Sequence, residues 1–259
     1  MFDQREFIQT PMSELLDLAS ASLVCLKSGI ETFPIREYVL QSLFLRMTGF
    51  QEQKMKCICW ELASADYEYR YRRVLSGKLG ECSNYSDKCS VYNDLVSAIE
   101  RKNNSFDLGT FTEGLSNDEA VKAIDGFYNS SLHLGWLNRD YQECHSFLWA
   151  SLNSTCIVTK SREKIFGECK DCKNKGSCSL QKPGHRIQSL VSVFNDAVYH
   201  HRNRCAHNIL AHCMNKTTFE ELQIGGVHRD NYLIRFMLLL MIDNVITKLF
   251  CEWNQSFTK

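Results

Sequence analysis

The sequence predicts an all-α protein. Apolar residues recur at helical spacing in almost every segment, no segment shows a strong period-two alternation typical of a β-strand, and only 3 of the 259 residues are proline. The main interruption is a stretch rich in lysine, cysteine and glycine at about 160–185, which we expect to be an inserted loop. We expect a single helical domain over 1–259, with an N-terminal half at 1–130 and a core carrying the functional residues at 131–259.

The expected helices follow the apolar spacing and the residues that start or stop a helix. Ser13 precedes the first, which reaches about residue 27. Pro34 suits the first turn of the second, which ends near residue 47. A long third helix is expected over 51–75, ended by Gly77. Further helices are expected at about 90–102, 116–130, 139–159, 187–201 and 231–253, with a short helix at 217–223.

The last turns of the 51–75 segment alternate aromatic and charged residues. Tyr67, Tyr69 and Tyr71 fall at every second position there, with charged residues between them. Tyrosines in such a helix can pack a seam against a neighbouring helix or stack on nucleic-acid bases. Packing of a seam is the favoured interpretation, and base stacking is the alternative.

Charge is balanced over the whole chain and unbalanced locally. The chain has 30 basic and 30 acidic residues, so its formal net charge is zero, which excludes a globally basic nucleic-acid binder. The segment 160–204 departs from this balance, with ten Lys and Arg residues against four acids. Phosphate binding requires a local excess of this kind. A solvated, lysine-rich loop is the alternative interpretation.

The chain shows no signal for secretion or for a membrane. Its first residues include charged side chains and lack the apolar core of a signal peptide, and the longest apolar run, 236–242, is far too short to span a bilayer. We therefore expect a cytoplasmic protein with no membrane partner. The 13 cysteines, an odd number, suit reduced thiols better than a disulfide scaffold. The thiols expected to be buried in helices are Cys25, Cys57, Cys59, Cys156 and Cys251.

Part of the inserted loop has the spacing of a metal site. Cys169 and Cys172 form a C-x2-C pair, which can present two thiolates to one ion. Cys178 and His185 would complete a tetrahedral Cys3His zinc site, with Cys156 as an alternative fourth ligand. An iron–sulfur cluster is an alternative centre, and free thiols are the alternative without a metal. A zinc ion here would be structural, so we expect no cofactor for catalysis.

The strongest functional signal is the run Arg202-Asn203-x-x-x-His207. An arginine can hold a phosphate in two-point contact and neutralise charge that develops on it. A histidine near its ordinary pKa can take a proton from a hydroxyl or give one to a leaving oxygen. The amide of Asn203 can orient either partner. Arg139 and His145 meet a looser form of the pattern, which we regard as coincidence, because the asparagine makes the 202–207 run more specific.

In these residues the chain resembles the HEPN family, the higher eukaryotes and prokaryotes nucleotide-binding domains. The family hallmark is an arginine, often followed by a polar residue, and a histidine four to six positions later, which Arg202, Asn203 and His207 match. The resemblance implies a helical bundle, a dimer that brings two motifs around one cleft and, in many members, metal-independent ribonuclease activity. Family toxins modified by partner nucleotidyltransferases often have tyrosine two positions after the histidine. Ile209 stands there, which argues against that regulation.

Helix geometry restricts how the motif can work. On an unbroken helix Asn203 and His207 share a face, whereas Arg202 and His207 point well over 90° apart. The arginine and the histidine can therefore meet at one phosphate only if the helix breaks between them, or if a symmetric second copy supplies one of them.

The leading hypothesis is a HEPN-type endoribonuclease, a toxin or an antiviral defence effector, that leaves 2′,3′-cyclic phosphate and 5′-OH ends. His207 would act as base or acid, Arg202 would stabilise the phosphorane and Asn203 would position the reactants. The alternatives are a non-catalytic HEPN-like RNA- or nucleotide-binding module with a structural zinc, and a zinc-stapled interaction protein whose motif is accidental. The expected partners are RNA, a second copy of the chain and a regulatory or antitoxin protein. Further RNA contacts are expected from Arg204, Lys173, Lys175 and Arg186.

Overall fold

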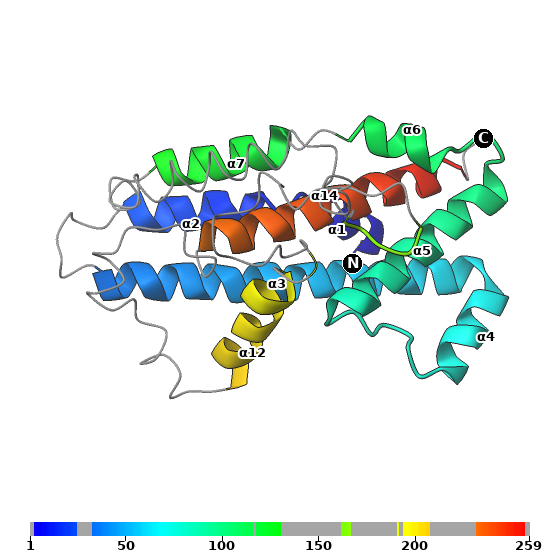
Figure 1. Ribbon diagram of the computed structural model, residues 1–259, viewed down its shortest axis with the longest axis horizontal. Coiled ribbons are helices and arrows are strands. Elements are labelled where there is room, and N and C mark those ends of the chain that lie inside the picture. The colour runs from blue at the N-terminus through cyan, green and yellow to red at the C-terminus, as the bar shows by residue number, and fades with distance from the viewer. Residues whose placement is uncertain are drawn as a thin grey trace, which may run out of the picture.

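A computed structural model describes residues 3–24, 33–115, 118–130, 162–166, 191, 194–207 and 232–256. Every regular element within these ranges is a helix, and none of them is a strand, so the prediction of an all-α fold is confirmed (Figure 1). None of the helices within them combines the length and the apolar character that a bilayer-crossing helix needs.

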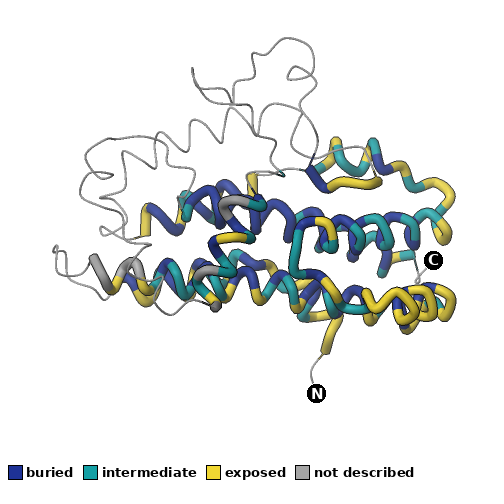
Figure 2. Tube along the Cα trace, turned by 60° about the horizontal axis from the view of Figure 1, so that its bottom comes forward, coloured by how far each residue is buried: buried dark blue, intermediate teal, exposed yellow. Residues whose placement is uncertain are grey.

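The core is built around α14 (Tyr232–Gln255), which is buried along most of its length. It contacts α3 (Phe33–Ala65), α5 (Tyr85–Lys102), α7 (Asp118–Asn129) and, more briefly, α1 (Gln4–Gln9). Figure 2 shows buried positions running along the facing sides of these helices. A helix surrounded in this way is apolar on nearly all sides, which explains the continuous apolar run of the sequence at 236–242.

The boundaries expected for the second and third helices are wrong. The structure has one helix, α3, that continues through the predicted gap at 48–50, and Gly49 sits in it without a neighbour that a side chain would meet. A glycine weakens a helix by only about 1 kcal/mol, which the packing of α3 offsets. The break comes instead at Asp66, whose extended backbone ends α3 and whose carboxylate accepts from the Tyr69 amide to start α4 (Tyr67–Leu75).

Other boundaries follow the side chains that cap them. α2 (Glu14–Val24) begins directly after Ser13, and α7 and α14 also begin within two residues of the expected positions. α5 begins five residues before the expected residue 90, because the Asn84 side chain accepts from the Asp87 amide at 2.8 Å and caps the helix there. The sequence did not indicate α1 or α6 (Leu108–Glu113), since six residues are too few for a periodic pattern.

The segment that carries the predicted motif consists of two consecutive helical pieces. A π-helical stretch, η2 (Phe194–Tyr199), leads directly into α12 (His200–His207), so the helix extends six residues past the predicted end at residue 201. Of the stretch expected to be an inserted loop, only 162–166 is described. There Phe166 is buried: its amide donates to Tyr85 Oη at 3.0 Å and its ring stacks on that tyrosine. The expected helices at 139–159 and 217–223 lie outside the described residues.

Candidate functional site

Arg202 and Asn203 lie on α12, which continues η2 and packs against α3. One terminal nitrogen of Arg202 contacts both carboxylate oxygens of Glu52, at 3.0 and 3.1 Å, and the other donates to Asn203 Oδ1 at 3.1 Å. The structure therefore brings together two of the three predicted motif side chains and adds a carboxylate from α3. A guanidinium has five N–H groups, so these contacts leave donors for a further anion.

A buried lysine lies behind this pair. Lys88 on α5 is 3% exposed, and its Nζ donates to the Cys82 carbonyl at 2.9 Å. Burial lowers the pKa of Lys88 to about 8; Glu52 opposes the shift, and the charge of Arg202 adds to it. The site thus combines two cationic groups with one carboxylate, an excess of positive charge in a poorly solvated place, which favours an incoming phosphate.

The space between these groups is small. Its volume is about 10 Å³, which is room for about one water molecule. The walls include the buried Phe194 and Val198 of η2, so the π-helical turn shapes the floor of the site. A phosphate must therefore approach the outer side of Arg202, whose side chain is 27% exposed. The lining residues are Thr48, Gln51, Glu52, Ser83, Lys88, Phe194, Val198, Tyr199, Arg202 and Leu239.

The helix that carries the motif does not break between its members. α12 runs without interruption from His200 to His207, so five residue steps turn the direction of the side chain by about 140° between Arg202 and His207. Of the two ways in which arginine and histidine could converge, a break in the helix is therefore excluded within 200–207. The side chains of His207 and Arg204 lie outside the described part of the structure.

The histidines next to the motif have other environments. His201 is buried between the rings of Phe44 and Tyr232, with centroid separations of 5.1 and 5.7 Å, and its Nε2 lies 3.5 Å from Cys205 Sγ. His200 is exposed and contacts the Tyr199 ring edge-on. His201 is therefore a core residue that fixes α12 on the bundle, and His200 faces solvent.

The predicted metal site and the side chains of the predicted RNA contacts lie outside the described part of the structure. Among the described residues no three side chains of the metal-binding kinds gather at one point. Of the cysteines expected in the core, Cys57 and Cys59 are buried as free thiols, whereas Cys251 is only half-buried. Cys25 and Cys156 lie outside the described residues, as do Cys169, Cys172, Cys178 and His185 of the metal site and Lys173, Lys175 and Arg186 of the expected RNA contacts.

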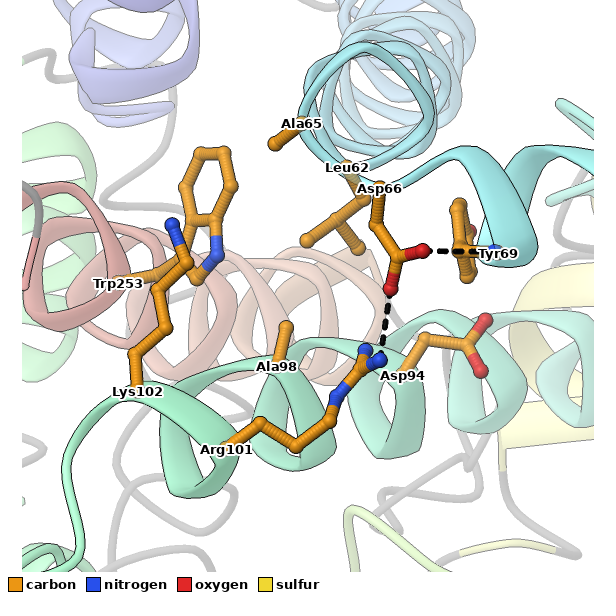
Figure 3. A pocket seen from close by; sticks show the side chains of 9 residues that line it. All are labelled: Leu62, Ala65, Asp66, Tyr69, Asp94, Ala98, Arg101, Lys102 and Trp253. Carbon is orange, nitrogen blue, oxygen red and sulfur yellow. Dashed lines mark hydrogen bonds and ion pairs between the residues drawn. The ribbon is translucent and has the colours of Figure 1, made fainter.

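A larger pocket of about 150 Å³ lies between the end of α3, α4, α5 and α14. Figure 3 shows Asp66 at its edge, accepting from the Tyr69 amide and from Arg101, whose Nη1 is 2.6 Å away. The second carboxylate at the edge, Asp94, pairs with Arg73. Because the carboxylates of this pocket are already paired, its charged rim serves to hold α4 against α5.

Sequence reasoning found Arg202 and Asn203 but missed Glu52 and Lys88. Both missed residues lie in segments with ordinary helical patterns, and nothing in a single sequence marks which positions on α3 and α5 face α12. The chain has no match among protein-family models, curated proteins or solved structures.

Proposed function

We propose that this chain is a HEPN-like, metal-independent endoribonuclease. The observation that carries the proposal is the arrangement of Arg202, which is partly exposed, held by Asn203 and Glu52, and backed by the buried Lys88. An arginine fixed by two neighbours is pre-organised for a phosphate, because its orientation needs little further ordering when the ligand arrives. The match of 202–207 to the family motif supplies the histidine that such a site needs.

In the proposed reaction the ribose 2′-OH attacks the adjacent phosphorus. A histidine, His207, takes the 2′-OH proton as the new O–P bond forms, and a proton is delivered to O5′ as the P–O5′ bond breaks. The products are a 2′,3′-cyclic phosphate and a 5′-OH. Arg202 neutralises the charge that accumulates on the phosphorane, and Asn203 keeps the guanidinium in place.

Two copies of the chain complete the site in this proposal. Because α12 is continuous and turns His207 away from Arg202, the histidine that serves a given Arg202 comes from a symmetric partner. A two-fold arrangement then gives two equivalent sites, each with Arg202 from one chain and His207 from the other. Glu52 holds Arg202 within its own chain until a phosphate competes for the guanidinium.

The test is incubation of the purified protein with mixed RNA in excess EDTA, followed by analysis of the new ends. We expect cyclic phosphate and 5′-OH ends, and a loss of rate of at least about 100-fold in both Arg202→Ala and His207→Ala. His200→Ala is the matched control, since this exposed histidine of the same helix should be dispensable. Wild-type protein that cleaves no RNA, or equal activity in Arg202→Ala, would contradict the proposal.

The pairing of Arg202 with Glu52 also fits the alternative function, a HEPN-like module that binds RNA or a nucleotide without cleaving it. Because Glu52 already neutralises Arg202, the arginine stabilises the extra charge of a transition state less well. A phosphate can still displace the carboxylate and bind the guanidinium. RNA binding that depends on Arg202, without any cleavage, would favour this function. A role as a toxin or a defence effector belongs to the nuclease proposal and depends on it.

A further inference from the structure

An apolar stripe lies exposed on α4, the helix that follows the break at Asp66. Tyr67 and Tyr71 are 69% and 56% exposed, and Val74 and Leu75 continue the same line about one turn after Tyr71. Tyr69, between the two tyrosines, points the other way and is buried. The expectation that these tyrosines pack a helix seam is therefore correct for Tyr69 and wrong for the other two.

The two exposed rings form a parallel pair. The ring centroids of Tyr67 and Tyr71 are 6.5 Å apart and the ring planes differ by only 14°. The guanidinium carbon of Arg70 lies over the Tyr67 ring, 5.2 Å from its centroid. Aromatic faces in parallel, next to a guanidinium that is itself planar, offer stacking surfaces for successive bases of a single strand.

The charge around this stripe suits a polyanion. Between residues 67 and 78 there are four basic residues and one acidic residue, so the local balance is positive although the chain as a whole is neutral. Arg73 is neutralised by Asp94. The side chains of Arg70, Arg72 and Lys78 are exposed and flank the stripe, against the single carboxylate of Glu68.

The stripe lies within reach of the Arg202 site along α3. α12 packs on this helix near Glu52, and α4 starts at Tyr67, with only Asp66 between it and the last residue of α3. The axial rise from Glu52 to Asp66 is about 21 Å, from 14 residues at about 1.5 Å each. In Figure 1 both α12 and α4 project from the same long side of α3. A strand of a few nucleotides can therefore extend from one to the other.

We propose that the Tyr67–Tyr71 surface of α4 is a stacking platform for single-stranded RNA that leads the strand to the Arg202 site. This inference rests on the proposed function and names how the substrate is held away from the scissile phosphate. A protein partner would also cover an apolar stripe, but paired parallel rings, a guanidinium over one of them and a positive flank all complement bases and phosphates.

Binding is measured with a labelled oligonucleotide of 2′-O-methyl ribose, which lacks the attacking hydroxyl and cannot be cleaved. Replacing both tyrosines with leucine, Tyr67→Leu and Tyr71→Leu, keeps an apolar stripe and removes the π faces. We expect this variant to bind at least about tenfold more weakly. The matched control, Tyr67→Phe with Tyr71→Phe, keeps the rings and should bind within about twofold of wild type. Since both replaced side chains are exposed, thermal unfolding of either variant should be nearly unchanged.

The salt dependence of binding gives a second, independent readout. Arg70→Gln and Arg72→Gln each remove one phosphate contact, so each should reduce the slope of log affinity against log salt by about 0.7. Equal binding by the leucine variant and wild type would overturn the proposal. A wild-type protein that does not bind the probe at all would overturn it too.

Failure of this inference can be told apart from failure of the proposed function. If RNA is cleaved but the leucine variant binds the probe normally, the platform is wrong and the nuclease stands. If no RNA is cleaved but binding of the uncleavable probe depends on the two rings, the nuclease is wrong and the platform stands. If both are right, the leucine variant should show a raised KM for long RNA, an unchanged kcat and normal cleavage of a dinucleotide.

Discussion

The ammonium group of Lys54 on α3 lies 2.7 Å from the carboxylate of Asp243 on α14, and both side chains are almost fully buried. Lys54 Nζ also donates to the Thr10 carbonyl at 2.7 Å, and Asp243 accepts from the Met12 amide at 3.1 Å. The pair thus joins the two central helices to the turn between α1 and α2. Burial lowers the pKa of Lys54 and raises that of Asp243, while the attraction between them opposes both shifts.

Removing one member of this pair should be far more harmful than removing both. We expect Lys54→Met to lower the free energy of unfolding by about 3–5 kcal/mol, because it leaves the Asp243 carboxylate buried without its counter-charge. Lys54→Met combined with Asp243→Leu should recover much of this loss. Urea unfolding of the three proteins measures the effect, and a double variant as unstable as the single variant would contradict it.

Lys88 should make the stability of the fold depend on pH. Burial lowers its pKa from 10.5 to about 8, so between these pH values the unfolded chain binds more protons than the folded chain. The free energy of unfolding therefore rises with pH in this window, by up to roughly 3 kcal/mol. The comparison protein is Lys88→Met, in which other titrating groups are retained. If the stability difference between the two proteins stays constant from pH 8 to 10.5, Lys88 is not held as described.

Glu52 and Glu61 of α3 each pair with an arginine, but only Glu52 should affect RNA binding. Glu52→Gln should tighten binding of uncleavable RNA several-fold, on the order of 1 kcal/mol, because Arg202 no longer has a competing carboxylate. Glu61 of the same helix pairs with the exposed Arg5 at 2.9 Å, so Glu61→Gln is a matched control and should leave binding unchanged. Weaker binding in Glu52→Gln would contradict this prediction and mean that the orientation which Glu52 gives Arg202 outweighs its competition with the phosphate.

Sequence patterns predicted the parts of this fold that depend on one helix at a time. The apolar run of α14 and the start of α2 were confirmed because periodicity and flanking residues act locally. The predicted helix break at 48–50 was wrong, and the chain breaks at Asp66. Gly49 and Asp66 are both possible helix breakers, and tertiary packing decides between them. In the candidate site, the motif predicted Arg202. Glu52 lies 150 positions earlier, and only the folded chain shows that the two side chains meet.

Asp66 separates α3 from α4, so its replacement tests what orients the exposed tyrosines. The amide of Tyr69 and the guanidinium of Arg101 lower the pKa of Asp66 below its ordinary 3.8. Its stabilising effect is therefore present above about that pH and is lost as the pH falls through the lowered pKa. Asp66→Ala should cost about 1 kcal/mol at neutral pH, whereas Asp66→Asn keeps the cap and should cost less. Equal losses in the two variants would show that the ion pair, and not the cap, holds α4.

The continuity of α12 makes a prediction about mixed subunits. If Arg202 of one chain works with His207 of the other, then a dimer of an Arg202→Ala chain and a His207→Ala chain has one site with both residues and one with neither. Random exchange places half of the chains in such dimers. Two inactive variants mixed in equal amounts should therefore regain about a quarter of the wild-type rate. The control is each variant mixed with itself. A mixture as inactive as its components would mean that a single chain must provide both residues, which the unbroken helix from His200 to His207 makes difficult.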